Sequence, residues 1–391
     1  MKPGQPTVPE DDFDLMRNDA LIRWQRALRI APRQGLGVVR RAVFFALFAW
    51  LPLVIWAALN QRLVDAGSGE PLLVHYGIHV RCLVAIPLFI LAEAMAAGVI
   101  RKIVRQFRLS GIVTDAQRAT FCKVLSDTAR LRDSSLPWIF VIGVAIAWTL
   151  GSPVQSDAHE MSWAAAGGDF GFGGWWFLFV ARPLFVVLAL GWLWRIVLVI
   201  VLFQRLARLE LALVPSHPDR TGGLGFVRKL PAAFFLVTLA ISAVLASRWM
   251  HDVLFHDHSL AAYKLPLAAF VALWSALLLA PLLMLVPRLA AMKRCALLDY
   301  GRLIGEHGRL VHRRWILGET IPPNELLDAP ELGPVADTAA IFEAIDKVRP
   351  LPVGKNTVAM MLVPVALPML FVVAQQIPLR EVLLKLLKTL V

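Results

Sequence analysis

A stretch of polar and glycine residues at positions 217–226, with the sequence HPDRTGGLGF, gathers several side chains capable of chemistry. Its His and Asp offer an acid/base pair, its Arg can bind anions, and its glycines permit backbone conformations that other residues avoid. No Gly-Lys-Ser/Thr follows, so it is not a Walker loop, and it lacks the spacing of a dinucleotide fingerprint. Two interpretations remain, a ligand-binding or interaction loop and a tight turn between two spans. The candidate residues are His217, Asp219, Arg220, Gly222 and Gly223.

A second polar group contains three histidines and two aspartates within eight residues, 251–258. Imidazole and carboxylate ligands suit zinc or another divalent ion, and His251 with His256, or His256 with His258, could chelate one if the chain folds back. The spacing matches no established metal signature. The alternative is a solvated polar loop between two spans, so these histidines are weak metal candidates and the sequence identifies no cofactor.

Charged residues inside apolar segments are the third candidate, because each is costly in a bilayer unless it is paired. Glu93 lies well inside one apolar segment, and Arg182 and Arg195 lie in another that is too long to keep both arginines in water. We expect Glu93 to pair with one of these arginines. Such a pair would either orient two helices or line a path for an ion or solute.

The elements that carry these residues are predicted to be transmembrane helices. The chain is 58% hydrophobic and 17% charged, with a mean hydropathy of +0.64, which exceeds what a soluble protein of 391 residues can bury. Backbone groups in lipid must be satisfied internally, and the apolar segments lack the alternation of a membrane barrel, so we predict an all-α bundle. The seven predicted spans are 42–59, 82–100, 137–151, 175–203, 230–249, 265–287 and 357–376.

The basic residues predict the orientation of this bundle, because Lys and Arg near span ends are retained on the cytoplasmic side. Of the 40 basic residues, 31 fall on alternate connections. This pattern predicts a cytoplasmic N-terminus and an outer C-terminus, although three basic residues of the tail lie on the unfavoured side. It also excludes nucleic-acid binding as the reason for the pI of about 10.2, because the charges form no aromatic-interleaved patch. The basic connections are 1–41, 101–136, 204–229 and 288–356.

The chain divides into a membrane bundle and cytoplasmic segments. Residues 1–41 form an amphipathic N-terminal segment, in which Leu21, Trp24 and Leu28 recur at helical spacing among arginines, as expected of a helix at an anionic lipid surface. The bundle occupies 42–294, with cytoplasmic loops at 101–136 and 204–229. A helical and proline-rich cytoplasmic loop follows at 295–356, and the last span with an amphipathic tail occupies 357–391.

The loop at 217–226 also resembles one found in a family of uncharacterised bacterial multispan inner-membrane proteins. The second half of the chain is similar to theirs in having Tyr300-Gly301 after the sixth span, Pro364 and Pro368 within the last span, and Pro378-Leu379-Arg380-Glu381 after it. The resemblance implies membership in that family and a bacterial inner-membrane location. It implies no catalytic residues.

Three classes of function remain open. The first is a non-enzymatic structural, signalling or partner-binding membrane protein, which contacts anionic lipids and a protein partner or a second copy of itself. The second is a channel or transporter with Glu93 and Arg182 in its pathway, although no paired helix breaks or internal repeats support it. The third is a membrane-embedded metal-dependent enzyme, for which the sequence offers no nucleophile and base at recognised spacing. We expect the first class.

Overall fold

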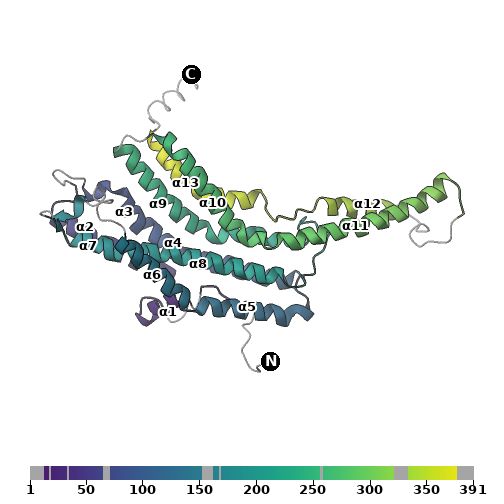
Figure 1. Cartoon of the computed structure of the whole chain (residues 1–391), viewed down its shortest axis with the longest axis horizontal. Helices are drawn as coiled ribbons and strands as arrows, with labels where there is room; N and C mark the ends of the chain where they lie inside the picture. Colours follow the sequence, from purple (N-terminus) through teal and green to yellow (C-terminus); the bar gives the residue numbers. More distant parts are fainter. Residues whose placement is uncertain are drawn as a thin grey trace, which may run out of the picture.

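The computed structural model describes residues 13–16, 19–32, 35–64, 71–151, 162–166, 169–255, 259–320 and 333–376. Within them the chain is almost entirely helical (Figure 1), and the strand pairing is a two-residue ladder between β1 (Ala165–Ala166) and β2 (Asp169–Phe170). The α-helices are α1 (Ala20–Ala27), α2 (Val38–Leu59), α3 (Tyr76–His79), α4 (Ile86–Leu109), α5 (Arg118–Asp133), α6 (Leu136–Gly151), α7 (Phe172–Trp176), α8 (Arg182–Ala207), α9 (Phe235–Phe255), α10 (Lys264–Leu283), α11 (Val286–Val311), α12 (Gly333–Asp346) and α13 (Lys355–Gln376).

Shorter helices of other types continue or connect these elements. The 3₁₀-helices are η2 (Leu72–Val74), η4 (Asp115–Gln117), η5 (Ser162–Ala164), η7 (Gly225–Phe234) and η8 (Leu260–Tyr263). The π-helices are η3 (Val80–Ala85), η6 (Phe177–Ala181) and η9 (His312–Ile316).

Seven helical runs among the described residues are long and apolar enough to cross a membrane, which confirms the predicted all-α, multi-pass class. Each overlaps one predicted span. The third run joins α5 to α6, but only the 16 residues of α6 are strongly apolar. At 1.5 Å per residue α6 measures about 24 Å, less than the roughly 30 Å of a hydrocarbon core. The seven runs are Val38–Leu59, Tyr76–Leu109, Asp115–Thr149, Phe172–Ala207, Gly225–Phe255, Leu260–Leu283 and Lys355–Gln375.

Helix α4 lies at the centre of the bundle and contacts α2, α8, α9 and η7. Its buried residues recur every three or four positions, so one continuous face points inward, including Phe89, Glu93, Ile100 and Phe107. Helices α5, α6 and α10 pack against α8, while α13 packs against α9. We call the end of the bundle that carries α7 the α7 end (Figure 1).

Helices α11 and α12 form a long arm that projects away from the bundle (Figure 1). The chain turns at Met284 and Leu285 between α10 and α11, because Pro287 at the start of α11 has no N–H to continue the ladder of α10. Helix α12 packs along α11, and Lys293 Nζ donates to Asp346 O at 2.6 Å. The predicted helical loop at 295–356 is therefore an extension of the sixth span with a second helix beside it.

The N-terminal helix α1 presents large apolar side chains to its surroundings. Trp24 and Leu28 on α1 are 66% and 69% exposed, while Gln25 is buried at 4%. Ile22 is also buried, at 0%, so α1 packs both an apolar and a polar residue against the bundle while Trp24 and Leu28 face outward, as expected of a helix at a lipid surface. The segment before α1 is attached to α4 by an ion pair, in which Arg101 Nη2 lies 2.8 Å from Asp14 Oδ2.

Candidate functional site

Four charged side chains meet inside the bundle, and we call them the charge quartet: Asp19, Arg41, Glu93 and Arg195. Each is at most 2% exposed. Glu93 of α4 accepts from both arginines, with Oε2 at 2.5 Å from Arg41 Nη1 and Oε1 at 3.0 Å from Arg195 Nη2. Asp19 Oδ2 accepts from Arg195 Nη2 at 2.9 Å and from Nε at 3.2 Å. Two cations therefore face two carboxylates.

Local structure explains how Asp19 reaches this depth. It is the N-cap of α1, where its Oδ1 accepts from Leu21 N at 3.4 Å, so one carboxylate oxygen serves the helix and the other serves Arg195. Gln25, two turns into α1, accepts from Arg41 Nε. The quartet thereby fixes α1 to three membrane helices, α2, α4 and α8.

Aromatic rings complete the environment of Arg195. Its guanidinium carbon lies 4.9 Å from the ring centroid of Trp192 and 6.0 Å from that of Trp138 on α6. Trp138 can approach α8 because Gly191 has no side chain, and a Cβ there would lie 2.8 Å from Trp138 Cη2. These cation–π contacts stabilise the guanidinium of Arg195 in the apolar interior of the bundle.

Arg182 does not join Glu93, although the sequence offered it as one of two possible partners. Arg182 lies nearer the α7 end of the bundle than Glu93 does. There it lines a cavity of about 450 Å³ together with Arg81 of η3 and Arg248 of α9. We call this the arginine cavity. The rest of its described lining is apolar or aromatic: Val144, Trp148, Phe185, Val186, Ala189, Leu190 and Val244.

The helices that carry two of these arginines share an irregularity. Arg81 lies within the π-helix η3, which precedes Pro87, and Arg182 directly follows the π-helix η6 and precedes Pro183. A proline cannot donate to the carbonyl four residues earlier, so the preceding turn widens into a π register. Both arginines therefore project from places where the regular hydrogen-bond ladder is interrupted, a feature common at binding sites.

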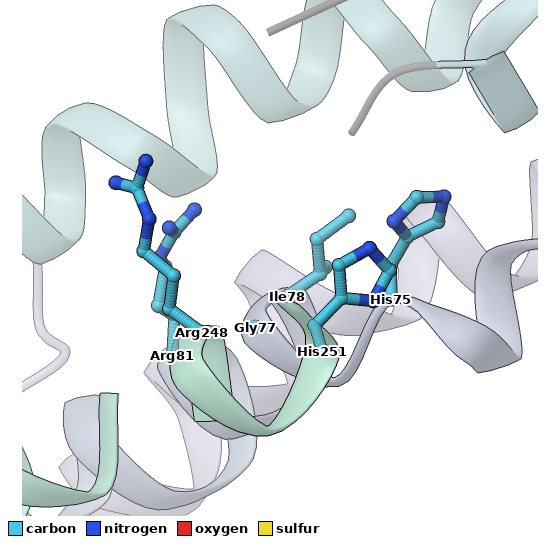
Figure 2. A pocket seen from close by; sticks show the side chains of 6 residues that line it. All are labelled: His75, Gly77, Ile78, Arg81, Arg248 and His251. Carbon is cyan, nitrogen blue, oxygen red and sulfur yellow. The ribbon is translucent and has the colours of Figure 1, made fainter. Parts of the chain in front are cut away.

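A smaller hollow adjoins the arginine cavity, because Arg81 and Arg248 line both (Figure 2). We call it the histidine hollow. Its other lining residues include His75 and His251, whose rings stack with centroids 5.6 Å apart. Its volume of about 20 Å³ holds roughly one water-sized group.

The loop at 217–226 is organised by one carboxylate. Asp219 Oδ1 accepts from Thr221 N at 2.8 Å and from Gly223 N at 3.1 Å, and Oδ2 accepts from Gly225 N at 2.7 Å. Gly223, with φ +94°, adopts a conformation that favours glycine, as does Gly222 at +64°. At Gly225 a Cβ would lie only 2.9 Å from Asp219 Oδ2.

Residues within and near this loop form hydrogen bonds with its remaining backbone groups. Arg228 Nη2 donates to Asp219 O at 2.7 Å, Arg349 N donates to Arg220 O at 2.8 Å, and Asp219 N donates to His217 Nδ1 at 3.2 Å. Burial by itself raises the pKa of Asp219, but the three backbone N–H groups outweigh it and lower that pKa below its ordinary value. The side chains that suggested acid/base chemistry thus serve a tight turn that joins α8, η7 and the segment before α13.

Only one of the three histidines predicted as weak metal ligands lies among the residues that the structure describes. His251 lies near the end of α9 and takes part in the histidine hollow, whereas His256 and His258 lie outside the described residues. In the part of the chain that the structure describes, no group of three or more His, Cys, Asp or Glu side chains is arranged to hold a metal ion. The amphipathic tail after residue 376 also lies outside the described residues.

Sequence reasoning missed several members of these sites. Arg41 was assigned to the cytoplasmic segment because it directly precedes the first apolar run, yet it is a fully buried residue of α2. The signal that could have found it is the adjacent pair of arginines at a span boundary, since only one of the two needs to face the headgroups. No sequence signal links Arg81, Arg248 and His75, which come together only in the tertiary structure.

Comparison of the chain with protein-family models, with curated proteins and with solved structures found no match.

Proposed function

We propose that this chain is a non-enzymatic, multi-pass membrane protein that binds an anionic amphiphile from the bilayer. The observation that carries the proposal is the arginine cavity, in which Arg81, Arg182 and Arg248 from three separate helices converge on one apolar space of about 450 Å³. This size is in the range of small-molecule sites, which are mostly apolar with a few polar groups that fix orientation. The apolar body of the ligand would occupy the cavity and its acidic head would contact the guanidinium groups.

The depth of the arginines supports a ligand that comes from lipid. At 1.5 Å per residue, Arg182 lies about 15 Å along its helical run from Phe172, and Arg248 about 10 Å from Phe255. Both positions are below the ends of the spans and within reach of the headgroup region. Arg248 and Trp148 of the lining are exposed, so the cavity is open at the surface of the bundle.

The distribution of basic residues supports a location in a bacterial inner membrane with the N-terminus in the cytoplasm and the C-terminus outside, as does the resemblance of the 217–226 loop to inner-membrane proteins. In that orientation the arginine cavity belongs to the outer half of the bilayer. The outward-facing Trp24 and Leu28 of α1, with the arginines beside them, would then contact anionic lipids of the cytoplasmic leaflet.

A pathway that includes both Glu93 and Arg182 is less favoured. Glu93 accepts from Arg41 and Arg195 within the charge quartet, whereas Arg182 lines a different space near the α7 end. A transporter would need to disrupt the quartet to pass a solute beside Glu93. The geometry therefore favours binding over transport through this pair.

The test uses the full chain in nanodiscs of zwitterionic lipid, titrated with decyl sulfate or with the neutral decyl glucoside and followed by calorimetry. We expect saturable binding of decyl sulfate and a loss of about tenfold in affinity for Arg182→Gln and Arg248→Gln, because each removes a charge-assisted hydrogen bond. Lys264→Gln is the matched control, since Lys264 is an exposed cation at the same end of the bundle that does not line the cavity. Equal affinities for both amphiphiles, or equal losses in the control, would refute the proposal.

A further inference from the structure

A narrow apolar groove lies between α1 and the start of α6, separate from the arginine cavity. Its volume is about 80 Å³, which is room for about six water-sized groups. Trp24 and Ile139, which line it, are 66% and 64% exposed, so the groove opens to the surroundings of the bundle. The proposed contact of α1 with the cytoplasmic leaflet would bring lipid to this groove, whether or not the arginine cavity binds a ligand. The other lining residues are Ala20, Leu21, Ser135, Trp138 and Ile142.

The indole of Trp138 leaves one buried donor unused at this groove. The side chain is 4% exposed, and within the described part of the chain its Nε1 has no hydrogen-bond partner. The ring face of Trp138 contacts Arg195, and its Cη2–Cζ3 edge faces Gly191. Neither contact uses the N–H, which lies in the ring plane on the other edge. A buried donor without an acceptor is costly, so a molecule in the groove that offers an oxygen would gain a hydrogen bond there.

The mouth of the groove, beside Ser135, is positively charged. Arg23 Nη2 donates to Asp133 O at 2.9 Å, which places the guanidinium of Arg23 at this mouth. A guanidinium has several N–H donors, of which this contact uses one. The carboxylate of Asp133 is neutralised, since Arg132 Nε and Nη2 lie 2.7 and 3.0 Å from its two oxygens. The N-terminus of α6 adds the positive end of a helix dipole, so the mouth favours an anionic group.

The order of these groups along α6 matches the order of groups in a glycerophospholipid. At 1.5 Å per residue, Trp138 lies about 4.5 Å along the chain from Ser135, and Ile142 lies about 6 Å further. The groove therefore passes from a basic mouth to a single donor and then to apolar side chains. A glycerophospholipid passes in the same direction from phosphate to ester carbonyl to acyl chain. A fatty acid, by contrast, has no acceptor below its charged head.

We infer that the groove between α1 and α6 binds one anionic glycerophospholipid. The phosphate of this lipid lies against Arg23 and the start of α6, and an ester carbonyl accepts from Trp138 Nε1. The first methylenes of one acyl chain pack on Ile139 and Ile142. The bound lipid thus fills the space between α1 and a helix, α6, that is too short to cross the hydrocarbon core by itself.

Two lipids that differ only in the ester carbonyls test this site: dioleoyl phosphatidylglycerol and its dioleyl diether analogue. Each is titrated into the full chain in detergent, and bound lipid is measured by native mass spectrometry. We expect the ester lipid to bind the tightest site about fivefold more strongly, the factor for one hydrogen bond. Trp138→Phe keeps a ring but removes the N–H, so its binding of the ester lipid should fall to the level of the ether lipid. Trp315→Phe, the same change at an exposed position on the arm, is the control and should keep the difference.

Binding of the ether lipid should be the same in Trp138→Phe and in the unmodified chain, which separates the lost hydrogen bond from misfolding. Equal binding of both lipids by the unmodified chain, or an ester preference that survives in Trp138→Phe, would overturn the site. Either result would leave the proposed function in place if decyl sulfate still binds, because the arginine cavity shares no lining residue with the groove.

The charge at the mouth is tested separately. Arg23→Gln should weaken both lipids by about tenfold, because it removes a charge-assisted contact with the phosphate. Arg309→Gln, which removes an exposed cation on the arm, should weaken neither. Glycerol 3-phosphate offers the same phosphate without acyl chains and should not displace the ester lipid at equal concentration. Displacement at equal concentration, or equal losses in Arg23→Gln and Arg309→Gln, would overturn the assignment to a lipid held at this mouth.

Discussion

The charge quartet and the arginine cavity both place arginines inside a membrane bundle, yet they differ in what surrounds them. In the quartet, Arg41 and Arg195 are enclosed and contact Glu93 and Asp19 within 3.0 Å. In the cavity, three arginines share the wall of an open, apolar space. The difference teaches that depth alone does not identify a functional charge. Arginines enclosed by carboxylates stabilise the fold, whereas we propose that arginines on the wall of an open space also bind a ligand.

The largest expected effect is on the quartet. Glu93→Gln leaves Arg41 and Arg195 buried without the carboxylate that they share, and losing one member of a buried ion pair costs about 3–5 kcal/mol. A large fall in Tm should follow, measured by thermal denaturation in nanodiscs. Glu210→Gln is the control, because Glu210 is an exposed carboxylate, and its Tm should be unchanged. A Glu93→Gln protein as stable as the control would remove the distinction between the two regions.

A smaller effect is expected where the quartet holds the N-terminal helix. Asp19→Asn keeps an N-cap side chain but loses the ion pair with Arg195, which is worth about 1.5–3 kcal/mol for a hydrogen bond to a charged group. Helix α1 should loosen, and trypsin should cleave more rapidly after Arg23 and Arg26. If cleavage remains as slow as in the unmodified chain, the quartet does not hold α1 in place.

A substitution in the arginine cavity should lower the affinity for a ligand but leave the stability of the fold almost unchanged, the opposite of a substitution in the charge quartet. Arg248→Gln changes an exposed side chain, so Tm should shift by less than the equivalent of about 0.5 kcal/mol, while the affinity for decyl sulfate falls about tenfold. Measuring stability and binding on the same preparation separates the two regions. A variant that lost as much stability as Glu93→Gln would show that the cavity is a structural element as well.

The loop at 217–226 provides the smallest expected effect and a third case for comparison. Because the folded protein lowers the pKa of Asp219, the ionised carboxylate stabilises the fold above its ordinary pKa of 3.8. This contribution is lost as the pH falls from that value through the lower folded pKa. Tm measured across this acid range should therefore fall more steeply for the unmodified chain than for Asp219→Asn. Binding of decyl sulfate at neutral pH should be the same in both.

The sequence predicted the seven apolar helices well, because runs of about 20 apolar residues report directly on the thickness of a bilayer. Glu93 stood out as a carboxylate within an apolar run. Its partner was left open because the fourth segment is longer than a membrane is thick, and only packing decides how that segment is positioned. The structure places Arg195, rather than Arg182, beside Glu93.

Other features could not be read from the sequence, for two physical reasons. The sequence predicts α1 at a lipid surface and the structure leaves Trp24 and Leu28 exposed, but nothing in its periodicity indicates that Asp19 and Gln25 reach into the bundle. The arginine cavity depends on three helices whose relative rotation is set by contacts distant in the chain. Neither local periodicity nor spacing contains that information.

The π-helices η3 and η6 have a consequence for how this protein could change over time. Each π turn accommodates one residue more than a regular turn, and each residue rotates a helix by about 100°. Removing one residue from Val80–Ala85 would restore a regular helix and turn Arg81 away from the cavity, while the part of α4 that carries Glu93 kept its position. The same span can therefore keep its structural half fixed while a single insertion or deletion redirects its other half, which makes these turns natural points at which ligand preference could diverge.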